Sequence, residues 1–186
     1  MNATSLTGIN SLIWDGNAEL DGSFHITGSI NSDEISGGSG NDVILGGAGS
    51  DFITGGFGSD LLSGGGGSDT FNFSAGSEST ILALDTVSDF VSGEDKFDFT
   101  TVPDDVITSP SYSASGTGDL IDDIGEAIVS GGPVTKSVVY VVAISGIGEG
   151  SYLFYDENGD NQVGMNELVL NLGNESDTIL SISDFI

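Results

Sequence analysis

The chain has 186 residues and carries 29 Asp and Glu against 2 Lys and Arg, a formal net charge of -27. With so few cations it lacks the positive charge that drives binding to nucleic acids and anionic lipids, so these partners are excluded, and no stretch is apolar for long enough to predict membrane insertion. Cysteine is absent, which excludes disulfides and thiolate metal sites. Because unbalanced negative charge destabilises a compact chain, a hard cation is the first partner to expect.

Residues 1–27 are expected to form an N-terminal cap with a degenerate first coil. Trp14 and Phe24 are predicted to pack against the end of the repeats, because buried aromatic side chains are the common case. His25, the single histidine, is expected to lie exposed on a strand.

A nine-residue pattern, G-G-x-G-x-D-x-U-x with U apolar, dominates residues 28–78. Strict copies begin at Gly37, Gly46, Gly55 and Gly64, and a weaker one begins at Gly28. Glycines at positive φ turn the backbone sharply, and the three residues after each Asp can form a short strand. An apolar residue recurs every nine positions and is predicted to point inward, at Ile26, Ile35, Ile44, Ile53, Leu62 and Phe71. The alternative is an acidic, Gly-rich linker, which gives no reason for this apolar period.

Stacking such coils brings every second turn to the spacing of paired strands. The carboxylates of Asp33 and Asp51, Asp42 and Asp60, and Asp51 and Asp69 would then face common gaps, where they repel unless a cation lies between them. Calcium suits these gaps because it takes 6 to 8 oxygen ligands in a forgiving geometry, whereas zinc prefers nitrogen and sulfur. The predicted ligand residues of this segment are Asp33, Gly37, Ser39, Asp42, Gly46, Gly47, Ala48, Gly49, Asp51, Gly55, Gly56, Phe57, Gly58, Asp60, Gly65, Gly67 and Asp69.

The pattern resembles the repeat-in-toxin (RTX) nonapeptide, a calcium-binding repeat. Residues 69–73 and 85–99 are similar to the segment after the repeats in serralysin-like C-terminal domains, which end secreted proteases, lipases and alginate epimerases. The resemblance implies a mainly β fold: a right-handed parallel β-roll with calcium in the turns, flanked by a small α+β cap. The residues themselves predict strands at 86–90 and 96–100 joined by a polar turn. Glu78, Asp85 or Asp89 could close a last calcium site, or could simply be solvated.

Residues 79–186 are expected to cap the roll and to carry a secretion signal. Residues 103–117 read as a surface loop and residues 119–129 as a short amphipathic helix. Strands are predicted at 137–145, 151–155 and 167–172. This half could cover the apolar seventh positions of the repeats, Phe52 and Leu61 among them; a binding partner is the other possibility.

A second group of oxygen ligands follows the strand at 151–155. Five residues have the spacing of positions 1, 3, 5, 7 and 12 of an EF-hand loop: Asp156, Asn158, Asp160, Gln162 and Glu167. Position 6 is Asn161 where glycine is expected, and the flanks look like strands rather than helices. A polar hairpin turn is therefore weighed beside a metal site.

The chain ends in Asp184, Phe185 and Ile186, which resembles the uncleaved C-terminal signal of type I secreted RTX proteins; an ordinary last strand is the alternative. The favoured function is a calcium-dependent folding and type I secretion module, secreted and extracellular, with an exoenzyme domain possible upstream. No catalytic motif is found, so the chain is not expected to be an enzyme. The alternatives are an extracellular adhesion or surface-structural module for polysaccharide, ice or self-association, and a small autonomous hydrolase.

Overall fold

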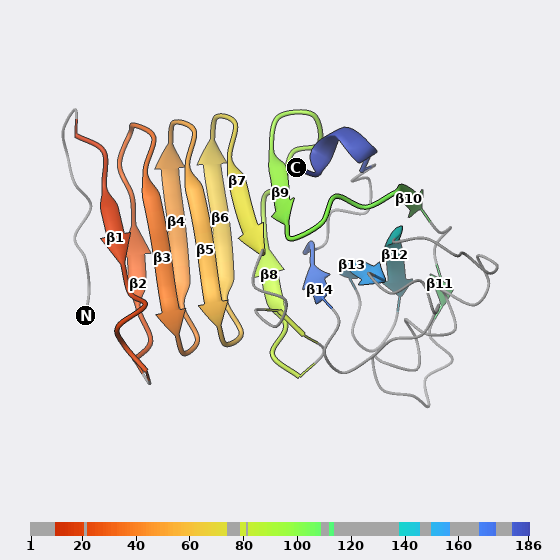
Figure 1. Ribbon diagram of the computed structural model, residues 1–186, viewed down its shortest axis with the longest axis horizontal. Helices are drawn as coiled ribbons and strands as arrows, with labels where there is room; N and C mark the ends of the chain where they lie inside the picture. Colours follow the sequence, from red (N-terminus) through yellow and green to blue (C-terminus); the bar gives the residue numbers. More distant parts are fainter. Residues whose placement is uncertain are drawn as a thin grey trace.

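The computed structural model describes residues 10–20, 22–73, 79–80, 82–108, 112–113, 138–145, 150–156, 168–173 and 180–186. In this part of the chain the regular structure is β strand, apart from one 3-10 turn, η1 (Ile182–Asp184). The strands lie in two sheets (Figure 1). The first contains, in spatial order, β1 (Ile13–Asp15), β3 (Glu34–Ser39), β5 (Phe52–Phe57), β7 (Thr70–Phe73) and β9 (Lys96–Phe99).

The second sheet begins with the other strands of the repeat region and continues into the C-terminal half. Its order starts with β2 (His25–Thr27), β4 (Val43–Ala48), β6 (Leu61–Gly66) and β8 (Asp85–Val87). It goes on through β14 (Leu168–Asn171), β13 (Gly150–Asp156), β12 (Val138–Ser145) and β10 (Asp105–Thr108), and β11 (Tyr112–Ser113) also pairs with β12.

Successive strands of the repeats alternate between the two sheets, so each strand pairs in parallel with the strand two repeats along. Ile35 pairs with Ile53, and Ile44 pairs with Leu62. The inward residues form one column between the sheets, and all are at most 1% exposed: Ile26, Ile35, Ile44, Ile53, Leu62 and Phe71. The predicted parallel β-roll and its nine-residue core period are confirmed.

The roll continues beyond the glycine-rich repeats. Val87 on β8 pairs with Leu62 on β6, and Phe97 on β9 pairs with Phe71 on β7. The strands predicted at 86–90 and 96–100 are present as β8 and β9, but they do not pair with each other as a hairpin: they belong to opposite sheets and extend the inward column. Phe90 and Phe97 stack at a centroid distance of 4.1 Å and widen the core at this end.

The C-terminal half is joined to the roll by shared strand pairing. Strands β12, β13 and β14 form an antiparallel unit, and β14 pairs in parallel with β8. The buried Ser79 hydroxyl strengthens this joint, because it donates to the Val169 carbonyl (2.6 Å) and accepts from the Asp85 amide (2.9 Å). The roll and the C-terminal half therefore share one continuous sheet.

The other expectations for the C-terminal half have mixed outcomes. The strands expected at 137–145, 151–155 and 167–172 are present as β12, β13 and β14. The expected loop at 103–117 is wrong in part, because β10 pairs in parallel with β12. The expected helix at 119–129 lies outside the described residues. Within the described ranges, no helix is long and apolar enough to cross a membrane.

The aromatic residues at the N-terminal end of the repeats are packed, whereas outward apolar residues of the repeats are partly exposed. Trp14 and Phe24 make an edge-to-face contact at 5.4 Å and pack against the core, as predicted, and His25 is exposed on β2. The expected cover for the outward apolar residues is not found among the described residues, which leave Phe52 37% and Leu61 42% exposed.

Candidate metal centre

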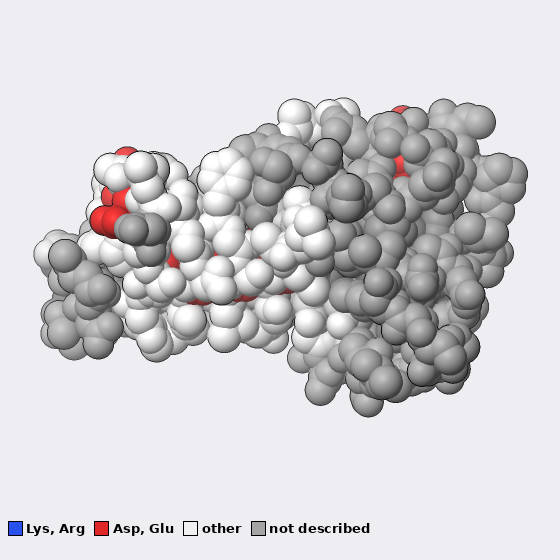
Figure 2. Space-filling view, turned by 90° about the horizontal axis from the view of Figure 1, so that it is seen from below, with Lys and Arg blue, Asp and Glu red and all other residues white. Residues whose placement is uncertain are grey.

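The repeat aspartates form two rows along the roll. Each lies at the start of a strand, and those just before β3, β5, β7 and β9 make the first row: Asp33, Asp51, Asp69 and Asp95. The second row contains Asp42 before β4, Asp60 before β6, and Asp85, the first residue of β8. In Figure 2 acidic side chains appear as a narrow line along the roll, almost closed over by uncharged residues.

Within each row every aspartate is hydrogen-bonded to the next one. In the first row the Asp33 amide donates to Asp51 Oδ1 at 2.8 Å, and the Asp51 amide donates to Asp69 Oδ1 at 2.9 Å. The Asp69 amide donates in turn to Asp95 Oδ1 at 2.9 Å. The second row repeats the pattern, with the Asp42 amide donating to Asp60 and the Asp60 amide to Asp85, both at 2.8 Å. One oxygen of each carboxylate therefore holds the preceding coil in register.

At the N-terminal end both rows stop at an apolar residue. Asp33 accepts a hydrogen bond from the Leu12 amide (2.6 Å), and Asp42 accepts one from the Phe24 amide (2.7 Å). Leu12 and Phe24 thus stand where a further coil would place aspartates, and they pack on the core. Atypical terminal coils are usual in stacked repeats, where they close the end of the core.

The second carboxylate oxygen has no such partner at three of the aspartates. Oδ2 of Asp42, Asp51 and Asp60 is buried and accepts no hydrogen bond from the described residues. These residues are only 1–2% exposed. Burial raises the pKa of Asp51 to about 6, against the hydrogen bond from the Asp33 amide and with further repulsion from Asp69 and Asp33. Burial likewise raises the pKa of Asp60 to about 6, with added repulsion from Asp42.

The glycines are needed at three positions for different reasons. The glycines at the second and fourth positions of each strict repeat have positive φ, for example 100° at Gly56 and 140° at Gly58. The first glycine has ordinary φ, but a side chain there would overlap oxygen atoms. A Cβ on Gly46 would collide with Asp51 Oδ2 and would come within 2.7 Å of the Gly64 carbonyl oxygen. The first position therefore requires glycine, because a carboxylate oxygen and a carbonyl oxygen occupy the space that a Cβ atom would need.

This arrangement suits a hard cation. The available donors are carboxylate and carbonyl oxygens, and the described residues contain no group of three or more His, Cys, Asp or Glu that could hold a metal ion. An ion in this part of the chain would therefore depend on backbone carbonyls beside a carboxylate pair. Calcium accepts such mixed oxygen sets, whereas zinc prefers nitrogen and sulfur.

The three carboxylate pairs predicted from the spacing, Asp33–Asp51, Asp42–Asp60 and Asp51–Asp69, are neighbours in the rows. The predicted third-position residues Ser39, Ala48 and Phe57 lie at the ends of β3, β4 and β5. Phe57 has an exposed side chain, and its carbonyl accepts from the Gly40 amide at 2.8 Å. Ala48 and Phe57 can therefore contribute backbone oxygen only, whereas Ser39 also has a hydroxyl oxygen.

The EF-hand-like group is only partly described. Asp156 lies at the end of β13 and is fully buried. The other four predicted ligands of that loop, Asn158, Asp160, Gln162 and Glu167, lie outside the described residues, as does Glu78.

Asp85 and Asp95 belong to the rows but stand outside the glycine-rich repeats. Their positions could have been found from a shorter signal, an aspartate followed after one residue by an inward apolar side chain: Asp85-Thr86-Val87 and Asp95-Lys96-Phe97. Burial raises the pKa of Asp95 above its ordinary value, against hydrogen bonds from the Asp69 and Val91 amides. Asp89 has another role, because it accepts from the Gly64 and Gly65 amides at 3.0 and 2.9 Å and so holds the last glycine turn.

The C-terminal residues dock on the same end of the roll. Asp184 is fully buried and accepts hydrogen bonds from the Ser92 hydroxyl (2.8 Å), the Gly93 amide (3.0 Å) and the Ser181 amide (2.8 Å). Lys96 Nζ lies 3.8 Å from its Oδ1. Burial alone would raise the pKa of Asp184, but these hydrogen bonds together outweigh it and hold the pKa below its ordinary value.

The last two residues continue the first sheet. Phe185 is buried against Phe97 and Phe99, and the Ile186 amide donates to the Phe97 carbonyl at 3.0 Å. The tail, residues 181–186, thus covers the β9 end of the roll.

Comparison with known proteins agrees with this geometry. A comparison with curated proteins finds no match. Among solved structures, the chain is similar to the AlgE6R3 subunit of the Azotobacter vinelandii mannuronan C5-epimerase, with 26% identity, a TM-score of 0.54, and coverage of 90% of this chain and 80% of that one. The AlgE6R2 subunit of the same enzyme aligns at 23% identity and a TM-score of 0.45, covering 90% of this chain and 88% of that one.

The family described as peptidase M10 serralysin C terminal matches residues 9–185, almost the whole chain. This family is the non-catalytic RTX region of serralysin-like proteins, and RTX repeat domains in general bind calcium. With its roll, its carboxylate rows and this match, the chain belongs to the serralysin C-terminal family and is an RTX-type calcium-binding repeat module.

Proposed function

We propose that the chain is a calcium-dependent folding and type I export module of a secreted RTX protein. The observation that carries this proposal is that buried carboxylate oxygens of Asp42, Asp51 and Asp60, in the two rows, accept no hydrogen bond from the described residues. Buried anions without counter-charge oppose folding, so a chain built this way folds when cations are available.

The residues that would hold calcium are the paired aspartates together with the turn residues of the repeats. The second carboxylate oxygens and turn carbonyls would coordinate calcium there, and the ion would supply the positive charge that the rows lack. On this proposal residues 1–27 cap the start of the roll, residues 28–78 carry the calcium sites, and residues 79–186 cap the other end and carry the export signal. The loop from Asp156 to Glu167 is a further candidate site.

Where calcium is scarce, as inside a cell, the carboxylates of the rows repel one another and the repeats stay extended. The tail with Asp184, Phe185 and Ile186 is then free for the secretion machinery. Outside, ligand that binds only the folded state stabilises it by mass action. The same tail then docks on Ser92 and Gly93, so that export and folding use it in turn. An exoenzyme domain upstream would be carried along.

Export is tested by expressing the full chain in a host with a type I exporter and measuring the amount in the medium. A variant with Asp184, Phe185 and Ile186 replaced by Ser should lose export. The matched control, Ser92→Ala with Lys96→Met, removes groups that hold Asp184 but leaves residues 181–186 unchanged, and should be exported normally. Export of the tail variant at the normal level would overturn the signal assignment.

Folding is tested separately by hydrogen exchange on the purified full chain. The amides of Asp42 and Asp51 should be protected in calcium and exchange rapidly in chelator, because their hydrogen bonds exist only in the stacked coils. Equal protection in both conditions would overturn the calcium dependence and leave the export result standing.

A further inference from the structure

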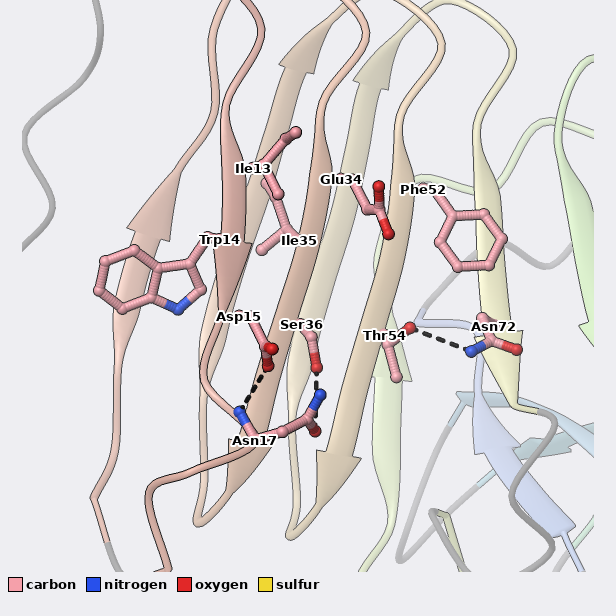
Figure 3. A pocket seen from close by; sticks show the side chains of 10 residues that line it. All are labelled: Ile13, Trp14, Asp15, Asn17, Glu34, Ile35, Ser36, Phe52, Thr54 and Asn72. Atoms are coloured by element: carbon pink, nitrogen blue, oxygen red, sulfur yellow. Dashed lines mark hydrogen bonds between the residues drawn. The ribbon is translucent and has the colours of Figure 1, made fainter.

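The outer face of the first sheet has a hollow of about 410 Å³ that lies across β1, β3, β5 and β7 (Figure 3). It is lined mainly by outward side chains of the sheet, together with Asn17 and the inward-facing Ile35, and it includes no aspartate of either carboxylate row. A hollow of this size is in the range that binds small ligands or a stretch of a longer one.

Hydroxyl and amide groups line the hollow in register. Asn72 Nδ2 donates to Thr54 Oγ1 at 3.0 Å, and Ser36 Oγ donates to Asn17 Oδ1 at 3.3 Å. Ser36 and Thr54 are register partners on neighbouring strands, yet no hydrogen bond joins them in the structure. Thr54 has accepted a hydrogen bond and still has its own O–H to donate, whereas Ser36 has donated and can still accept.

The two hydrogen bonds therefore point the same way across the sheet, from Asn72 towards Asn17, and the link between Thr54 and Ser36 is missing. This missing link is called the gap. A group that fills the gap can accept from Thr54 and donate to Ser36 at the same time. A hydroxyl does both, whereas a carboxylate or sulfate can only accept and offers Ser36 no donor. The gap thus suits an alcohol better than an anion.

The surroundings of the gap suit a sugar. Phe52 stands two residues before Thr54 on the same face and is 37% exposed, which offers a flat apolar surface to a ring. Glu34 stands two residues before Ser36 and is exposed, so its carboxylate can accept from a second hydroxyl. Asp15 and Glu34, the charged residues at the hollow, are both acidic and repel uronate or sulfated chains.

We propose that this hollow binds a neutral carbohydrate, with one sugar hydroxyl between Ser36 and Thr54 and the ring against Phe52. A second copy of this chain is disfavoured as the occupant, because two surfaces of one strongly acidic protein repel each other. The site goes beyond the proposed folding and export function and is independent of it.

The test is calorimetric titration of the calcium-loaded full chain with neutral hexasaccharides of glucose in β-1,4, β-1,3 and α-1,4 linkage, of mannose and of xylose. A uronate hexamer serves as the anionic comparison. At least one neutral hexamer should bind, and the uronate hexamer should not bind more tightly.

Two variants locate the binding. Thr54→Val keeps the shape of the side chain and removes the hydroxyl, and should weaken binding about tenfold, as expected for one unreplaced hydrogen bond. Phe52→Ala should weaken it at least as much. Thr27→Val and Leu61→Ala are the matched controls, since they occupy the ninth and seventh repeat positions on the opposite sheet, and should leave binding unchanged.

Circular dichroism in calcium should show that all four variants keep the roll, so that a loss of binding is local. No binding by any neutral hexamer, tighter binding of the uronate hexamer, or equal effects of the variants and their controls would overturn the proposal.

Discussion

The backbone amide of Asp51 donates a hydrogen bond to Oδ1 of Asp69, 2.9 Å away and two repeats along the chain. The same contact recurs from Asp33 to Asp51. Asp51 therefore uses one carboxylate oxygen to hold the coil before it, while its other oxygen is buried without a hydrogen bond from the described residues. One residue type thus sets the register of the coils and supplies oxygen to the proposed calcium sites.

Asp51 belongs to two of the predicted carboxylate pairs, whereas Asp33 belongs to one. Asp51→Asn should raise the calcium concentration at the folding midpoint by about tenfold or more, because two sites lose a charge. Asp33→Asn should raise it by only a few fold, since Asp33 lies at the end of its row and Ser29 already donates to it. The midpoints are measured by calcium titration followed by circular dichroism. Equal shifts for the two variants would contradict the assignment of Asp51 to two calcium sites.

Gly56 and Gly66 provide a matched pair of glycines. Gly56 has a φ of 100°, and a Cβ there would collide with the Gly38 carbonyl oxygen. A Cβ on Gly66 would meet nothing within 4 Å. Gly56→Ala should cost roughly 2 kcal/mol or more in calcium, and Gly66→Ala should cost less than about 0.5 kcal/mol. Urea unfolding of both variants checks this, and similar costs would argue against the strained turn.

In the calcium-free chain, binding of protons should stabilise the roll, as binding of calcium does. Folding raises the pKa of Asp51 and Asp60 from 3.8 to about 6, so the folded state binds protons more tightly than the unfolded state between these values. The calcium-free roll therefore gains stability as the pH falls through 6 towards 4 and loses it as the pH rises. Circular dichroism in chelator at pH 7.5 and pH 5 measures this, and β signal that stays constant or falls at pH 5 would be the contrary result.

Asp184 should show the opposite pH dependence. Its pKa is lowered by hydrogen bonds in the folded chain, so its contribution is present above the ordinary value of 3.8 and is lost as the pH falls below it. Asp184→Ala should cost about 2–4 kcal/mol at pH 7 in calcium, because it leaves the Ser92 hydroxyl and the Gly93 amide without their acceptor. Thermal unfolding measures the cost. A variant as stable as the parent chain would show that the tail does not cap the roll.

Much of the roll could be predicted from the sequence because its repeat is strict. The repeat has an apolar residue every nine positions and glycines at fixed offsets before each aspartate. Few backbone conformations other than a stacked coil are compatible with this pattern. The last two coils were not predicted as part of the roll, because Asp85 and Asp95 follow no glycine turn and are separated from their row neighbours by 25 and 26 residues instead of 18.

The C-terminal half shows the limit of local patterns. The apolar run at 138–145 predicts its own strand, but the parallel pairing of β10 with β12, and of β14 with β8, depends on partners distant in the sequence. The role of Asp184 was likewise hidden, since its hydrogen-bond donors Ser92 and Gly93 lie about ninety residues earlier. Such contacts leave no periodic signal.

The most direct test is far-UV circular dichroism of the full chain at pH 7.5, first in chelator and then with stepwise calcium. Little β signal is expected in chelator, and it should appear cooperatively with calcium. Magnesium at equal concentration should restore much less, because it demands a tighter octahedral site. A β signal in chelator equal to that in calcium would contradict the claim that the carboxylate rows make folding depend on calcium.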